Sequence, residues 1–316
     1  MAGYKVEEYF MKMKAAAFAE FGPADVLRTT ELDAPQAGPG QVRVNVKAAG
    51  VMPYDPAVRA GWTPAGYTMT FPEIPGNEFA GVIDEIGEGV TGFAVGDEVL
   101  GFSMLKCYAE YLAVNADQIV RKPASMSWET AGGFPGNAQG AALALEVLEV
   151  GKGDTLLIHG ASGGLGTLTI QLAKQLGAAA VIATASEPNH EYLRSLGAIP
   201  VAYGEGVVDR VRAAAPQGVD AALDLAGEEA LRASVELVAD RKRIGTMVAY
   251  HLHEELGVQV VRGERTAERL AGMVERYDRG ELTVHLRHVY PLDRAADAHR
   301  DVESGHGRGK VVISIG

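Results

Sequence analysis

The segment IHGASGGLG, residues 158–166, contains two overlapping motifs that would support unrelated chemistry. Residues 160–164 match G-x-S-x-G, the strained turn on which α/β-hydrolases present a nucleophilic serine. Residues 161–166 match a glycine-rich dinucleotide-binding turn in which alanine replaces the first glycine. In the first interpretation Ser162 attacks a substrate, and in the second it takes no part in the chemistry.

The elements expected on either side of this segment favour the dinucleotide interpretation. The apolar run at residues 155–158 predicts a strand, and apolar residues at helical spacing predict a helix from about Gly164. The unpaired amides and the dipole at such a helix N-terminus stabilise a diphosphate, and small residues let the backbone approach it. The predicted cofactor-binding residues of the turn are Ala161, Ser162, Gly163, Gly164, Leu165 and Gly166.

A serine hydrolase remains an alternative, because Asp224 or Asp278, with one of His285, His288 and His299, could complete a triad with Ser162. Hydrolases of this kind place several parallel strands before the nucleophile. Here the preceding region is rich in turns instead, which makes the hydrolase the weaker interpretation.

The pattern of apolar residues changes along the chain. From Lys14 to about Val120, short apolar runs are cut by Gly, Pro and Asp, and the alternation of Val42, Val44 and Val46 predicts a small antiparallel, barrel-like β structure. After a break near Phe134, apolar strands alternate with amphipathic helices, a pattern typical of a doubly wound parallel sheet. The predicted fold class is therefore α/β with a second, β-rich domain.

The composition narrows the range of partners. The 316 residues carry a net charge of -12 with no run of basic residues, which argues against nucleic acid and anionic membranes as partners. A single cysteine, Cys107, suits a reducing cytoplasm and cannot form an internal disulfide. No segment has the length and apolarity of a signal peptide or a membrane span. We therefore predict a cytoplasmic protein.

Several longer segments together resemble the medium-chain dehydrogenase/reductase superfamily, in its zinc-free quinone oxidoreductase branch. They are MKAAAFAEFGPADVL, PGQVRVNVKAAGVMPYDPAVRAG, FPEIPGNEFAGVIDEIGEGVTGFAVGDEVLGF, HGASGGLGTLTIQLAKQLGA and GHGRGKVVISI. The resemblance implies a GroES-like β-barrel domain at 1–133 with a loose extension at 1–13, a Rossmann domain at 134–284, and a return to the first domain at 285–316. It also implies an active site in the cleft between the domains and a homodimer, formed through the segment ELGVQVVRG.

The resemblance also bears on metal binding. Zinc-dependent relatives hold their catalytic metal with a cysteine and a histidine at the positions of Met52 and Asn77, and they carry a four-cysteine lobe that is missing here. Because tetrahedral zinc prefers thiolate and imidazole ligands, we expect no zinc.

The end of the second Rossmann strand predicts NADPH rather than NADH. No acidic residue stands at Ala183–Ser186 to accept the ribose hydroxyls, so a 2′-phosphate would meet no repulsion there. Ser186 can donate to the phosphate, and Tyr203 matches a tyrosine that relatives place near it. Pro188 stands where many relatives have a lysine or arginine, so His190 or Arg194 would have to supply the missing cation.

The resemblance implies hydride transfer to a quinone or to the C=C bond of an α,β-unsaturated carbonyl compound. The predicted catalytic residues are Tyr54 and Asn137, and the predicted substrate pocket contains Met52, Tyr54 and Gly140. Met52 and Gly140 replace an asparagine and a threonine that are usual in this branch. The neighbouring Asp55 is expected to brace Arg59 or to cap a helix.

Four further residues match places where relatives bind the cofactor or close the cleft, namely Thr246, Val248, Arg308 and Lys310. For Lys310, a plain surface cation is an equal alternative. The replacements at Met52 and Gly140 also leave open a protein that keeps the fold and the nucleotide without redox chemistry, either as a binding protein or as a cyclase.

Overall fold

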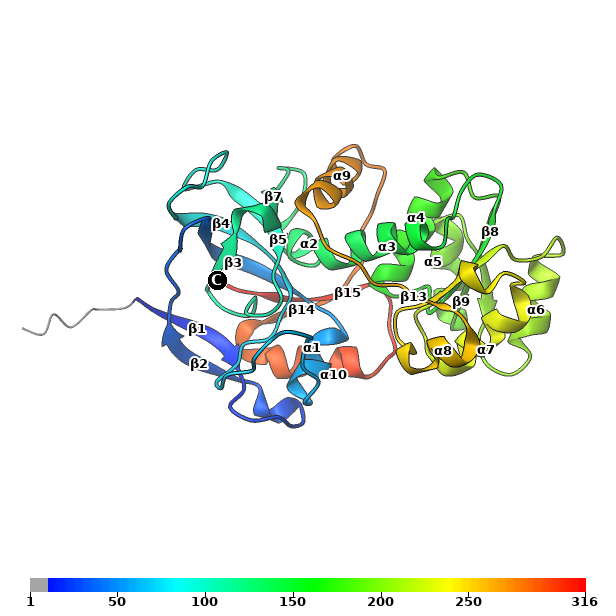
Figure 1. Cartoon of the computed structure of the whole chain (residues 1–316), viewed down its shortest axis with the longest axis horizontal. Coiled ribbons are helices and arrows are strands. Elements are labelled where there is room, and N and C mark those ends of the chain that lie inside the picture. Colours follow the sequence, from blue (N-terminus) through cyan, green and yellow to red (C-terminus); the bar gives the residue numbers. More distant parts are fainter. Residues whose placement is uncertain (1–10) are drawn as a thin grey trace, which may run out of the picture. The chain divides into compact units, whose positions relative to one another are not determined.

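The computed structural model describes residues 11–316, which form two compact units (Figure 1). The first unit contains the described part of Met1–Gly133 together with His288–Gly305 and Val311–Gly316, and the second contains Phe134–Arg287 and His306–Lys310. Of the predicted N-terminal extension, residues 1–10 lie outside the described residues. The prediction is wrong for Lys12 and Met13, because strand β1 begins at Lys12 and pairs with β2, which buries Met13.

The first unit is built around antiparallel strands, as the alternation of apolar residues predicts. In β3, Val42, Val44 and Val46 are buried while the intervening residues are partly exposed. The main sheet has the order β14-β15-β3-β4-β5-β7, β6 pairs with β3, and β1 and β2 form a separate pair. The strands are β1 (Lys12–Ala17), β2 (Arg28–Asp33), β3 (Gln41–Val51), β4 (Glu78–Ile86), β5 (Glu98–Phe102), β6 (Tyr111–Asn115), β7 (Ile119–Arg121), β14 (Leu286–Pro291) and β15 (Lys310–Ser314), and the helices are α1 (Tyr54–Arg59), α2 (Trp128–Gly132) and α10 (Ala295–Glu303).

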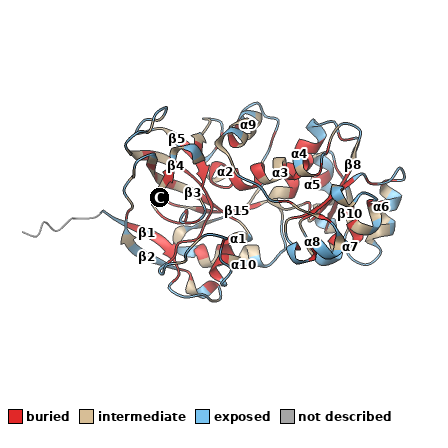
Figure 2. Ribbon diagram, in the orientation of Figure 1, coloured by how far each residue is buried: buried red, intermediate tan, exposed pale blue. Residues whose placement is uncertain are grey.

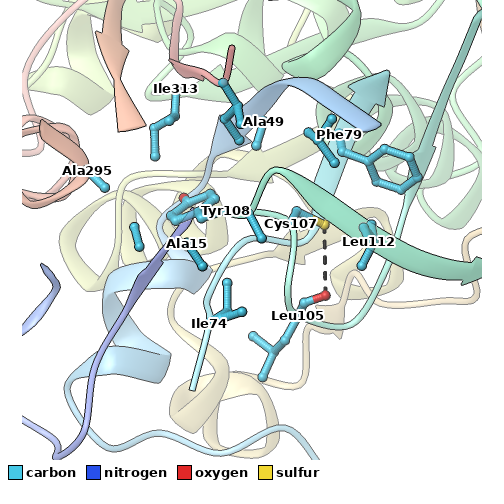
Figure 3. Close-up of a cluster of buried hydrophobic side chains, with 14 of the residues drawn as sticks. Ala15, Ala49, Ile74, Phe79, Leu105, Cys107, Tyr108, Leu112, Ala295 and Ile313 are labelled. Carbon is cyan, nitrogen blue, oxygen red and sulfur yellow. Dashed lines mark hydrogen bonds between the residues drawn. The ribbon is translucent and has the colours of Figure 1, made fainter. Parts of the chain in front are cut away.

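The core of the first unit joins segments from both ends of the chain (Figure 3). Ala15 from β1, Phe79 from β4 and Ile313 from β15 lie in one buried cluster. Cys107 is also buried there, and its thiol donates a weak hydrogen bond to the Leu105 carbonyl at 3.9 Å. The cysteine therefore serves as a small core residue.

The second unit is a doubly wound α/β fold. Its six-stranded sheet has the order β10-β9-β8-β11-β12-β13, and the paired strands are parallel. The strands are β8 (Thr155–His159), β9 (Ala180–Ala185), β10 (Ile199–Ala202), β11 (Ala221–Asp224), β12 (Ile244–Thr246) and β13 (Gln259–Val260), and the helices are α3 (Pro135–Val147), α4 (Gly164–Gln175), α5 (His190–Ser195), α6 (Val207–Ala214), α7 (Glu228–Leu237), α8 (His253–Leu256) and α9 (Ala267–Asp278).

This strand order fixes where a ligand can enter the second unit. The chain winds outward through β8, β9 and β10, and then returns to the other side of β8 with β11. Ligands of open α/β sheets bind beyond the carboxyl ends of the strands at such a reversal. The strands β8, β9 and β11 are largely buried, as parallel strands covered on both faces must be (Figure 2). The end of β8, where the glycine turn begins, therefore lies at the expected binding position.

None of the helices in residues 11–316 is both long enough and apolar enough to cross a bilayer.

Candidate functional site

The glycine turn links β8 to α4 with little side-chain cover. Gly163 precedes the first residue of α4, and among the described residues no side chain caps this helix end. A Cβ atom on Gly163 would meet only the Gly160 carbonyl oxygen, at 3.6 Å, whereas one on Gly166 would lie 2.7 Å from the Ala161 Cα. Gly163 thus leaves the backbone open, and Gly166 allows strand and helix to pack closely. The amides at the start of α4, which no side chain of the described residues caps, fit a diphosphate group.

Segments distant in sequence lie against this turn. The Gly309 amide donates to the Ser162 carbonyl at 2.9 Å. A Cβ atom on Gly164 would lie 2.4 Å from Nδ2 of Asn137 and 3.6 Å from Cβ of Lys310. The structure therefore brings the predicted residues Asn137, Gly164 and Lys310 together. The alternative of Lys310 as a surface cation is wrong, because this side chain is buried where the 306–310 segment joins β15.

The surroundings of Ser162 do not match those of a catalytic serine. The non-glycine residues with positive φ in the described chain are Lys106 and Glu149, so Ser162 lacks the left-handed backbone of a strained turn. Within residues 11–316, no histidine forms a hydrogen bond with the side chain of Ser162. The candidate acid Asp224 accepts bonds from Thr246 and from two backbone amides. The geometry favours the dinucleotide interpretation.

The side chain of Arg308, which is distant in sequence, lies near the end of β9. Nε of Arg308 donates to Oδ1 of Asn189 at 3.2 Å, Nη2 donates to the Pro188 carbonyl at 3.2 Å, and the guanidinium lies 4.6 Å from the centre of the Tyr192 ring. Ser186 accepts from the amide of the same Asn189, at 3.1 Å. Arg308 thus lies beside Ser186, where the sequence between Ser186 and Arg194 offered no evident clamp.

The neighbours of Arg308 were not all foreseen. Tyr192, which supports the guanidinium, has no motif that marks it in a single sequence. Of the two cations considered from the sequence, His190 lies 3.2 Å from the Ala185 carbonyl through Nε2, and Arg194 is exposed on α5. Tyr203, just after β10, is 56% exposed and so is available to a ligand.

Thr246 binds other parts of the fold through its side chain. Its hydroxyl donates to Oδ2 of Asp224 at 2.8 Å and accepts from the Ala249 amide at 2.9 Å, while burial raises the pKa of Asp224. These bonds hold the turn after β12 to the end of β11. Any contact of Thr246 with a cofactor would therefore use its backbone, whereas the neighbouring Val248 is exposed.

Gly140 lies on α3 opposite the glycine-turn helix. A Cβ atom there would come within 2.9 Å of Cδ1 of Leu165 and 3.7 Å of Cε of Met247. The small residue lets α3 pass close to α4, so Gly140 lies beside the predicted cofactor-binding residue Leu165. This contact gives Gly140 a packing role.

In the first unit, Asp55 fixes the start of α1. Its Oδ2 accepts the Met52 amide at 2.8 Å and the Tyr108 hydroxyl at 2.9 Å. Burial, together with the nearby Asp55 carboxylate, raises the pKa of Tyr108 well above its usual value. The predicted capping role of Asp55 is not confirmed, because among the described residues no side chain caps the N-terminal end of α1. The buried carboxylate instead holds the backbone of Met52 in place.

Arg59, at the other end of α1, is almost fully buried. Nε donates to the Gly22 carbonyl at 3.0 Å, Nη1 lies 3.3 Å from Nδ1 of His299, and Nη2 pairs with Glu303. Burial and the nearby guanidinium lower the pKa of His299 to about 3. Helix α10 therefore provides partners for Arg59 that sequence reasoning did not consider.

Tyr54 lies between two partly exposed neighbours. Its hydroxyl donates to the Met104 carbonyl at 3.3 Å, and its ring meets that of Trp62 edge-on, with centroids 5.2 Å apart. Sequence reasoning named Tyr54 but neither neighbour, because an exposed Trp or Met carries no motif.

The residues present do not suit a zinc site. At the two positions where the resemblance implies zinc ligands the chain has Met52 and Asn77, and a thioether and an amide are poor ligands for this metal. Across the described residues, no three or more His, Cys, Asp or Glu side chains cluster in a way that could hold a metal ion.

Comparisons with known proteins agree with this architecture. Residues 38–134 match the family described as alcohol dehydrogenase GroES-like domain, and residues 196–313 match the family described as zinc-binding dehydrogenase. A solved quinone oxidoreductase from Coxiella burnetii is 30% identical, with a TM-score of 0.88 over 97% of this chain and 100% of that chain.

Two curated relatives extend the comparison. The NADPH-dependent alkenal/one oxidoreductase of Arabidopsis thaliana is 28% identical over 96% of this chain and 79% of its own length. The quinone oxidoreductase of Mus musculus is 26% identical over 96% of this chain and 98% of its own length.

A GroES-like domain joined to a Rossmann fold with an open glycine turn defines the class of the protein, which is that of the oxidoreductases using a nicotinamide nucleotide. Within that class, the chain belongs to the medium-chain dehydrogenase/reductase superfamily, in its quinone and alkenal/one oxidoreductase branch.

Proposed function

We propose that the protein is a zinc-independent, NADPH-dependent reductase of quinones or of the C=C bond of α,β-unsaturated carbonyl compounds. The observation that carries the proposal is the position of Arg308 beside Ser186 at the end of β9. A cation at this place matches the 2′-phosphate that distinguishes NADPH from NADH. The names of the Arabidopsis and mouse relatives support the choice of cofactor and acceptors.

The second unit contains the residues that would hold NADPH. The amides at the start of α4 would bind the diphosphate, and Asn137 and Lys310 lie against the same turn. Arg308 and Ser186 would bind the 2′-phosphate, and Tyr203 is exposed nearby in sequence after β10. When bound, NADPH supplies the hydride for the reduction.

Arg308 is prepared for an anion by its surroundings. Two of its nitrogens are held by Asn189 and Pro188, and the Tyr192 ring supports the guanidinium. Its third nitrogen, Nη1, has no partner among the described residues. A fixed guanidinium with a free donor loses little side-chain entropy when it binds a phosphate.

In the first unit, Tyr54 and Met52 would contact the acceptor. The Tyr54 hydroxyl can donate a hydrogen bond to an acceptor oxygen on which negative charge develops, which stabilises that charge. In the structure this proton is shared with the Met104 carbonyl at 3.3 Å, a long bond that an acceptor oxygen could replace. Asn137 is the second proposed catalytic residue, at the glycine turn.

We also propose that two copies pair through β13, which lies at the edge of the six-stranded sheet. Pairing would satisfy the open hydrogen-bonding groups of that edge. A dimer would elute at twice the monomer mass, and a proline at Val260 should reduce that mass.

The test of the proposed function is a titration with NADPH and NADH, followed by addition of quinones and enones. We expect tighter binding of NADPH and its oxidation by at least one acceptor. Arg308→Gln should weaken NADPH binding by about 10- to 100-fold, the loss expected for one charge-assisted phosphate contact, while NADH binding is unchanged. Arg194→Gln is the matched control, since Arg194 is exposed on the nearby α5. Equal effects on both nucleotides would contradict the role of Arg308.

A further inference from the structure

The surface beside Tyr54 carries two side chains that neither the fold nor the proposed cofactor site requires. Trp62 is 51% exposed and Met104 is 45% exposed, although both are large and apolar. Each of them contacts Tyr54, Trp62 through its ring and Met104 through its backbone carbonyl. Exposed apolar residues that gather around a proposed site residue mark a binding surface more often than single ones do.

The backbone holds Trp62 in this position. Its amide donates to the Ala57 carbonyl at 2.9 Å, which closes the turn after α1. Gly61 permits the turn, because its φ of +117° is one that side-chain-bearing residues rarely adopt. The backbone of Trp62 is therefore held relative to α1, and the ring contact places its indole beside Tyr54 at the start of that helix.

The ring geometry leaves part of the indole available. The Tyr54 and Trp62 rings meet at 76°, so the contact is edge-to-face and does not cover both faces of the indole. The exposed half of Trp62 can therefore take a second ring in a stacked arrangement. Stacking favours a flat, electron-poor ring over the electron-rich indole face.

We propose that Trp62 determines acceptor specificity by stacking on the flat ring of the acceptor. The acceptors favoured are ring compounds, such as bicyclic quinones or enones conjugated to an aromatic ring, over short open-chain enones. The exposed Met104 would add soft apolar contact at the side of the acceptor. This inference rests on the proposed function, because that function brings an acceptor to Tyr54.

The test compares two acceptors in four proteins. Menadione provides a bicyclic ring and but-3-en-2-one does not, and the proteins are the wild type, Trp62→Ala, Trp62→Phe and Trp128→Phe. Trp128 is the matched control, because it is the other of the two tryptophans and also lies in the first unit.

Trp62→Ala should lower kcat/KM for menadione about tenfold, mainly through KM, the size expected for one lost aromatic stack. The kcat/KM of Trp62→Ala for but-3-en-2-one should stay within twofold of the wild-type value. Trp62→Phe, which keeps a flat ring, should retain most of the wild-type kcat/KM for menadione.

A second measurement needs no turnover. Menadione should quench tryptophan fluorescence in a saturable manner in the wild type and in Trp128→Phe. This saturable quenching should be absent in Trp62→Phe. An equal loss of kcat/KM for both acceptors would show that Trp62 only packs against Tyr54, and unchanged kinetics with menadione would also overturn the inference. If neither acceptor oxidises NADPH in the wild type, the proposed function fails. The fluorescence titration then still decides whether Trp62 binds a flat ring.

Discussion

The glycine turn of the second unit and helix α1 of the first present their chemical groups in different ways. The turn offers backbone amides with open space in front of Gly163. In α1, by contrast, Asp55 and Arg59 are buried and bonded to Tyr108, His299 and Glu303. A substitution at Gly163 should therefore change ligand binding with little effect on folding, whereas substitutions at Asp55 and Arg59 should first reduce stability.

The largest effect is expected from Arg59→Leu. Removing a guanidinium that is 2% exposed breaks its bonds to the Gly22 carbonyl, to His299 and to Glu303, which is itself 38% exposed. Loss of such a largely buried hydrogen-bond network should destabilise the protein by about 3 kcal/mol. Denaturant unfolding would measure the loss. Arg212→Leu, at an exposed ion pair, should change the free energy of unfolding by less than about 1 kcal/mol. If both variants behave alike, the buried contacts of α1 do not stabilise the unit.

Gly163→Ala tests the opposite behaviour in the turn. With φ of −70° at this position and no atom nearer than 3.6 Å, the methyl group fits the fold but occupies the space where a diphosphate would meet the amides. The affinity for NADPH should fall about 100-fold, which corresponds to about 2.7 kcal/mol. Titration and thermal unfolding would separate the two effects. Gly151→Ala is the control, as a Cβ atom there meets nothing within 4 Å. A large drop in Tm with Gly163→Ala would contradict the expected difference, because the turn would then affect stability as α1 does.

Acid should affect the two regions alike, because a buried histidine lies beside each of them: His159 ends β8 just before the turn, and His299 on α10 contacts Arg59 of α1. Burial lowers the pKa of His159 to about 4, and burial with the nearby Arg59 lowers that of His299 to about 3. Both values lie below the unfolded value of about 6.5, so the unfolded chain binds the proton first and stability falls as the pH drops below about 6.5.

At pH 5 each histidine should reduce the free energy of unfolding by about 2 kcal/mol. The variants His159→Gln and His299→Gln should each lose less stability between pH 7.5 and pH 5 than the wild type does. Denaturant titrations at the two pH values would show this. Parallel losses in all three proteins would mean that other groups cause the acid sensitivity.

The smallest effect is expected from Ser162→Ala. Its carbonyl accepts from Gly309, and this bond does not depend on the side chain. NADPH oxidation should therefore stay within about twofold of the wild type, the range of an ordinary surface substitution. Complete loss of activity in a folded variant would revive the nucleophile interpretation of the turn.

The parts of the molecule that could be predicted from sequence are those with local patterns. The alternation in β3 and the order of strand, glycine turn and helix at residues 155–175 each depend on neighbouring residues, and both are confirmed. The resemblance to the superfamily is also confirmed. A local pattern is readable because period and spacing express the element directly.

Side-chain partners from distant segments could not be predicted in this way. Arg308 reaches Asn189 across 119 positions, and Arg59 reaches Glu303 across 244. No spacing rule links such residues, since their approach depends on the packed fold. The contact of Tyr192 with Arg308 was missed for the same reason, whereas Trp62 was missed because an exposed tryptophan carries no motif. Asp55 was singled out because it lies at the start of a predicted helix, three residues from Met52.

The central position of β15 has a consequence for how the protein is made. Val311–Ser314 pair with β3, so the last strand of the chain lies inside the main sheet of the first unit, between β14 and β3. On the ribosome, the residues up to Gly133 emerge early but must wait for residue 314 before that sheet can close. Most of the second unit, Phe134–Arg287, is complete before then. Although domains usually fold in the order of synthesis, here the second unit can finish first, and the nascent first unit would expose an unfilled β edge until β15 has been synthesised.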